Sequence, residues 1–142
     1  MTDAQGRFTI EMTPVPRARE TDRGVVAQGA VGHRWARRLR VFRYEVRCWR
    51  DGTIPDLDEA VESPRRLTDD GHLSSRVLDL APRIPTRVWG RDEHGTGDMW
   101  NSNSVISWLI ASSGIETGSI APPAGGRAPG WRAGLAVAVS RP

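Results

Sequence analysis

The chain has 142 residues, a length that fits one domain with a modest hydrophobic core. Its 20 basic and 17 acidic residues are mixed along the sequence and leave a formal net charge of +3, so we expect no specific nucleic-acid-binding surface. The basic residues are all arginine, which indicates a high-GC coding bias. A single cysteine excludes an internal disulfide. The sequence shows neither a membrane span nor a signal pattern, and we therefore expect a cytoplasmic protein.

Residues 1–32 are weakly patterned and are predicted to form an N-terminal arm. Polar and apolar residues alternate over residues 7–12, which predicts one strand, and Pro14 and Pro16 end it. The arm is expected to be partly flexible or to pair with the edge of a sheet. Residues 33–142 are predicted to form a single α+β domain.

Residues 39–49 give the clearest strand pattern in the chain. Phe42, Tyr44, Val46 and Cys48 share one face, which we expect to point into the core. Charged residues occupy the other face, so we interpret most of the surrounding arginine-rich block as a solvated sheet surface. Cys48 is then an inert core thiol.

The middle of the chain alternates turns with short helical patterns. Asp51 and Gly52 mark a turn, residues 57–62 could form one or two helical turns, and residues 71–80 predict an amphipathic helix. The carboxylates of residues 56–62 have neither a histidine cluster nor a metal-loop spacing, and we expect no metal site. Residues 90–98 and 120–130 are predicted loops, and residues 134–139 a final apolar strand.

The stretch from Met99 to Gly114 combines a polar start with an apolar helical stripe. Asn101–Ser104 can cap a helix, and Gly114 suits its left-handed end. Val105, Ile106, Trp108 and Leu109 follow at helical spacing, and we expect Trp108 to be buried. We also expect at least one of Asn101 and Asn103 to be buried and bonded through its side chain to a backbone group outside its own helix turn. The polar start is either a structural cap or a site where the helix dipole activates a nucleophile.

These elements together predict an α+β fold, a small mixed sheet with two or three helices. Their order, from Tyr44-Glu45-Val46 through Arg87-Val88-Trp89 and Asn101–Ser104 to Pro122-Pro123, resembles an uncharacterised bacterial group related to the permuted papain-like (NlpC-type) peptidases and amidases. The resemblance spans roughly residues 33–131 and implies a permuted papain-like arrangement.

In catalytic members of that group a cysteine nucleophile heads the later helix and pairs with an earlier histidine. The resemblance implies that Ser102 occupies the nucleophile position, with His33 as the base and His94 as an alternative base. Trp100, Asn101 and Asn103 are the implied substrate-binding residues.

Three functions follow as alternatives. The first is a hydrolase or acyltransferase in which Ser102 attacks a carbonyl and backbone N–H groups at the helix start stabilise the oxyanion. The second is an inactive relative that binds a small molecule or a peptide, lipid or glycan fragment, and the third is a structural or interaction domain. No cofactor is expected in any of them.

Overall fold

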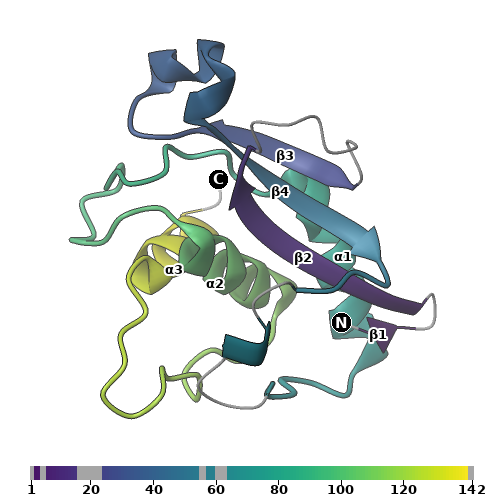
Figure 1. The fold of residues 1–142 in the computed structure, drawn as a ribbon. Coiled ribbons are helices and arrows are strands. Elements are labelled where there is room, and N and C mark those ends of the chain that lie inside the picture. The colour runs from purple at the N-terminus through teal and green to yellow at the C-terminus, as the bar shows by residue number, and fades with distance from the viewer. Residues whose placement is uncertain (1, 4–5, 16–23, 55–56, 60–63, 141–142) are drawn as a thin grey trace.

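The computed structural model describes residues 2–3, 6–15, 24–54, 57–59 and 64–140. A four-stranded sheet has the order β1-β2-β4-β3, with β1 Thr2–Asp3, β2 Gly6–Pro14, β3 Val25–Ala30 and β4 Arg43–Arg50. Three α-helices follow, α1 Gly71–Leu80, α2 Ser102–Ser113 and α3 Trp131–Val139 (Figure 1). The α+β class predicted from the sequence is confirmed.

The described strands pair antiparallel with their neighbours in the order β1-β2-β4-β3, so this sheet is antiparallel and not mixed as predicted. Ile10 and Met12 of β2 lie opposite Cys48 and Val46 of β4, so the predicted strand at residues 7–12 is confirmed. On the other side of β4, Gly29 of β3 lies opposite Tyr44, and a Cβ there would come within 2.2 Å of the tyrosine ring. β3 was not predicted, because its small residues give no clear alternation. The division between an arm at 1–32 and a domain at 33–142 stays a prediction.

The sequence placed the start of β4 too early. Residues 34–42 instead form two 3₁₀ helices, η1 Arg34–Arg38 and η2 Arg40–Phe42, and Phe42 is exposed. Local bonds favour these turns, because the N–H groups of Leu39 and Phe42 donate to Ala36 and Leu39. The predicted solvated face of β4 also needs correction, since Glu45 is only 3% exposed and accepts hydrogen bonds from Gln28 and Arg47.

The predicted final strand at residues 134–139 is wrong, because this segment belongs to α3. The apolar run suggested a strand, but the three alanines of α3 favour a helix, and its buried residues are Ala133, Gly134 and Val137. A Cβ on Gly134 would lie 2.1 Å from Ser104 O, so the glycine allows α3 to approach α2 closely.

The predicted helix at residues 71–80 is confirmed in its bounds, and Asp70 caps it by accepting the N–H of His72. It continues into a 3₁₀ turn, η4 Ala81–Arg83, while η3 Leu57–Glu59 is the described part of the short predicted helix at 57–62. No helix in the described ranges is long and apolar enough to cross a membrane.

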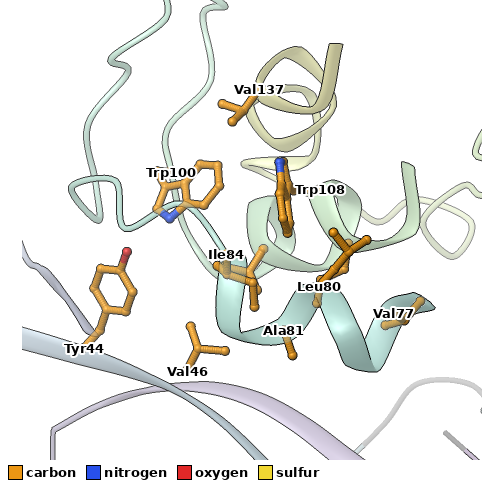
Figure 2. Close-up of a cluster of buried hydrophobic side chains, with 11 residues drawn as sticks. Tyr44, Val46, Val77, Leu80, Ala81, Ile84, Trp100, Trp108 and Val137 are labelled. Carbon is orange, nitrogen blue, oxygen red and sulfur yellow. The ribbon is translucent and has the colours of Figure 1, made fainter. Parts of the chain in front are cut away.

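The hydrophobic core lies between the sheet and the helices (Figure 2). Tyr44 and Val46 rise from β4 toward Trp100, Ile84 and the helices, as Figure 2 shows. Trp108 of α2 is 4% exposed, so its predicted burial is confirmed. Ile106, predicted on the same stripe, is instead exposed because it lies on the outer side of α2. Cys48 packs against the edge of the core, and burial raises the pKa of its thiol, as expected for an unreactive cysteine.

Candidate functional site

The polar start of α2 holds the turn that begins α3. Asn101 is the N-cap, and its Oδ1 accepts the N–H groups of Asn103 and Ser104 at 2.9 and 3.3 Å. The Nδ2 groups of Asn101 and Asn103 both donate to the carbonyl oxygen of Pro129, each at 2.8 Å. Both asparagines therefore bind a backbone group outside their own helix turn, as predicted for at least one of them. The prediction that one of the two is buried is wrong, because both are half-exposed.

Two further side chains complete this attachment, which we call the α2–α3 clamp (Asp98, Asn101, Asn103 and Ser104). The buried hydroxyl of Ser104 lies 2.7 Å from Gly130 O, and it accepts the N–H of Asn101 to close a capping box. The carboxylate of Asp98 accepts the N–H of Gly130 at 2.6 Å and that of Arg132 at 3.1 Å. The clamp satisfies backbone groups at the first turn of α3, where a helix otherwise leaves its N–H groups unpaired.

The predicted nucleophile and bases lie on three different segments. Ser102 is half-buried at the first turn of α2, and His94 is exposed in the loop that follows Glu93. The ring of His33 lies 2.7 Å from a guanidinium nitrogen of Arg91 and stacks on Trp35. Within the described ranges, no hydrogen bond joins Ser102 to any histidine. The Ser102–His33 pairing therefore stays a prediction.

The implied substrate-binding residues have structural roles, although the buried Nε1 of Trp100 has no hydrogen-bond partner in the described part of the chain. Trp100 is 2% exposed and lies in the core, while Asn101 and Asn103 bind Pro129. Asp92 organises the loop that carries His94, because its carboxylate accepts N–H groups of Thr96, Gly97 and His94. The N–H of Thr96, with smaller contributions from the other two, holds the pKa of Asp92 below its usual value.

A cleft of about 520 Å³ lies away from the start of α2. One wall is formed by the end of β3 and by η1, and the other by residues 85–88. We call it the arginine cleft, and its lining residues are Ala30, Arg34, Arg37, Pro85, Thr86, Arg87 and Val88. Its two walls are joined by a parallel bridge between Val31 and Trp89. Arg91 adds a second connection by donating to Gly32 O at 2.7 Å.

Glu93 binds two of the residues that line the arginine cleft. Its carboxylate accepts the N–H of Val88 at 3.1 Å and pairs with the guanidinium of Arg34 at 2.8 Å. Partial burial alone raises the pKa of Glu93, but the Val88 N–H and the charges of Arg34 and Arg87 outweigh it, so the pKa lies below its usual value. Three arginines and one carboxylate leave this cleft with an excess of positive charge.

The side chain of Arg87 is the least satisfied group of the cleft. Its Nε is buried and has no hydrogen-bond partner in the part of the chain that the structure describes. Its backbone is fixed, because the Arg87 carbonyl oxygen accepts the hydroxyl of Tyr44 at 2.7 Å. The Arg87 backbone is thereby held beside the cleft, and a guanidinium at this place is suited to an anionic oxygen.

Comparison with known proteins adds no relative: no family model matches this chain, and neither a curated protein nor a solved structure is similar to it. Sequence reasoning missed the arginine cleft because its two walls, residues 30–37 and 85–88, are far apart in the chain. One signal was available: all charged residues from Arg34 to Arg43 are arginine, and apolar residues separate them where acidic ones are more usual.

Proposed function

We propose that this domain is a non-catalytic binding module whose arginine cleft takes a ligand with an anionic phosphate or carboxylate group. The observation that carries the proposal is that Arg34, Arg37 and Arg87 line one cleft, while Arg37 and Arg87 have no ion-pair partner among the described residues. Guanidinium groups that line a cleft without a paired carboxylate are suited to a ligand that supplies an anionic oxygen.

The chemistry of the lining indicates the ligand class. Guanidinium groups present planar pairs of N–H donors that match the two oxygens of a carboxylate or phosphate. Ala30, Pro85 and Val88 provide apolar surface for a carbon portion beside the anionic group. A small phosphorylated or carboxylated molecule fits this combination, as does the anionic part of a peptide or glycan.

Calorimetric titration with inorganic phosphate and with glycerol phosphate tests the proposal. We expect saturable binding that weakens as salt is added, because salt screens the charges. Arg87→Gln and Arg37→Gln each remove one guanidinium. We expect each to weaken binding by at least about tenfold, since a hydrogen bond to a charged group contributes roughly 1.5–3 kcal/mol.

Arg127→Gln is the matched control, because it removes the same charge from the exposed loop before α3. Equal affinity of Arg127→Gln and wild type, with weaker binding by both cleft variants, supports the cleft. Equal losses in all three variants would mean that only net charge matters, and absence of binding would reject the proposal.

The second candidate is the papain-like hydrolase or acyltransferase implied by the resemblance. Its supporting observation is that the hydroxyl of Ser102 is half-buried at the N-terminal turn of α2, beside clamp residues that hold the local backbone. A fluorophosphonate probe labels an activated serine, so labelling that Ser102→Ala abolishes would support catalysis. Absence of labelling in the folded wild type would reject it. We retain the cytoplasmic location as part of either proposal.

A further inference from the structure

The segment formed by η1 and η2, residues 34–42, stands out from the end of the sheet (Figure 1). We call it the arginine spur. Only Ala36 is buried in it. The guanidinium of Arg43 fixes its shape by donating to the carbonyl oxygens of Arg37 and Arg38. The spur is therefore an ordered surface element with almost all of its side chains outside the core.

The exposed side chains of the spur are of two kinds. The large apolar ones are exposed by 70% for Trp35, 52% for Leu39, 65% for Val41 and 43% for Phe42. The charged ones are Arg34, Arg37, Arg38 and Arg40, and the spur contains no acidic residue. Arg34 pairs with Glu93, whereas the described carboxylates include no partner for Arg37, Arg38 or Arg40. Large apolar groups this exposed mark an interaction surface when they are contiguous and bordered by polar residues.

We propose that the arginine spur docks on a bilayer that contains anionic lipids, with Trp35, Leu39 and Val41 in the interface and a lipid phosphate in the arginine cleft. Arginine with tryptophan and aliphatic residues on one short element is the composition that binds the headgroup and acyl boundary. The charges match anionic headgroups, and arginine stems can lie along the apolar region while their guanidinium groups stay with phosphates.

A bilayer suits this surface better than a nucleic acid does. Aromatic side chains bind single-stranded nucleic acid by stacking on bases, but Leu39 and Val41 cannot stack. Both aliphatic side chains instead gain free energy by leaving water for hydrocarbon. An RNA oligonucleotide is therefore the competing partner that the experiment must include.

The cleft connects the spur to the proposed function. Arg34 and Arg37 belong to η1 and also line the arginine cleft, so the spur and cleft are continuous. A phosphate on a lipid headgroup could reach the cleft from the surface on which the spur lies. This inference rests on the proposed anion site and names its ligand as a phospholipid headgroup.

The test measures co-sedimentation with two kinds of vesicle, phosphatidylcholine alone and phosphatidylcholine mixed with phosphatidylglycerol. We expect binding to the mixed vesicles, weakened by salt, and at least about tenfold less binding to the neutral ones. The double variant Leu39→Ser/Val41→Ser should lose at least about tenfold in vesicle binding while it keeps wild-type affinity for glycerol phosphate. Arg87→Gln should weaken binding of both.

Leu57→Ser is the matched control for the loss of an exposed leucine, since Leu57 is 45% exposed on η3, at the opposite end of the molecule in Figure 1. It should bind vesicles as the wild type does.

Circular dichroism of each variant before sedimentation shows whether it is folded, and Trp35→Phe serves as a second spur variant. Loss of quenching by brominated lipids in Trp35→Phe would show that Trp35 enters the interface.

The outcomes separate this inference from the proposed function. Glycerol phosphate binding without vesicle binding would overturn the bilayer and leave the anion site intact. Vesicle binding that Leu39→Ser/Val41→Ser leaves unchanged would overturn the role of the spur. Tighter binding of a single-stranded RNA oligonucleotide than of mixed vesicles at the same salt would overturn the choice of partner.

Discussion

The hydroxyl of Tyr44 donates a hydrogen bond of 2.7 Å to the backbone carbonyl oxygen of Arg87. Tyr44 is fully buried in the core, and Arg87 lines the arginine cleft. Burial raises the pKa of Tyr44 to about 12, with a smaller opposing effect from the nearby Trp100 indole, so the hydroxyl stays protonated and able to donate. Strand β4 thereby fixes the position of one wall of the cleft.

Tyr44→Phe tests this connection. The variant keeps the ring but leaves a buried carbonyl oxygen without its donor, which costs about 1–3 kcal/mol of unfolding free energy. We also expect weaker binding of phosphate, because the Arg87 backbone is less constrained. Urea denaturation and calorimetric titration measure the two effects. A variant with wild-type stability and affinity would show that this bond supports neither the fold nor the cleft.

The clamp predicts that Asn101→Ala lowers the unfolding free energy more than Asn103→Ala does. Asn101→Ala removes both an N-cap acceptor and a bond to Pro129, whereas Asn103→Ala removes only the bond to Pro129. We expect losses of about 1–3 kcal/mol for Asn101→Ala and about 0.5–1.5 kcal/mol for Asn103→Ala. Chemical denaturation of both variants gives the order, and a larger loss in Asn103→Ala would contradict these roles.

Trp108→Ala probes the packing of α2. The side chain is buried among the helices, as Figure 2 shows, and its removal leaves a cavity that the core can only partly fill. We expect a loss of about 3–5 kcal/mol in unfolding free energy, a large fraction of the stability of a domain of this size. Ile106→Ala on the exposed side of α2 is the control, and denaturation curves that coincide for the two variants would contradict the assigned helix orientation.

The lowered pKa of Glu93 predicts that the stability of the fold depends on pH. Its pKa is lower in the folded chain than in the unfolded chain, so the unfolded state binds the proton more readily. The stabilisation is therefore present above the unfolded pKa of glutamate, about 4.3, and is lost as the pH falls through the folded value.

The measurement for Glu93 compares the unfolding free energies of the wild type and Glu93→Gln between neutral and acidic pH. We expect the wild type to be more stable at neutral pH and the difference to shrink on acidification. A constant difference would show that the carboxylate charge contributes nothing through Arg34 and Val88.

The sequence predicted some elements well because residues close together in the chain determine where those elements begin and end. Asp70 and Asn101 cap α1 and α2, and Gly114 ends α2 with a positive φ of 91°. The strand at residues 7–12 followed from its alternation. These features depend on neighbours within a few positions, which a pattern search can see.

Other elements depend on contacts between distant residues. The segment at 134–139 contains no polar residue that would show a helical or strand period. Its packing on α2, where Gly134 lies against Ser104 and Ser107, involves residues far back in the chain. The arginine cleft likewise needs the bridge between Val31 and Trp89 to bring Arg37 near Arg87. The sequence predicted the clamp role of the asparagines but could not predict the cleft, since nothing local links its two walls.

The Nε–H resonance of Arg87 in a nitrogen–proton NMR spectrum tests the anion site most directly. Burial of Nε slows its exchange with water, so the signal should be visible, and assignment is possible by comparison with Arg87→Gln. On titration with inorganic phosphate we predict a saturable shift of this resonance that is larger than the shift of the Arg47 Nε–H, which already donates to Glu45. An Arg87 resonance that stays in place, while shifts gather at the start of α2 or nowhere, would contradict an anion site in the arginine cleft.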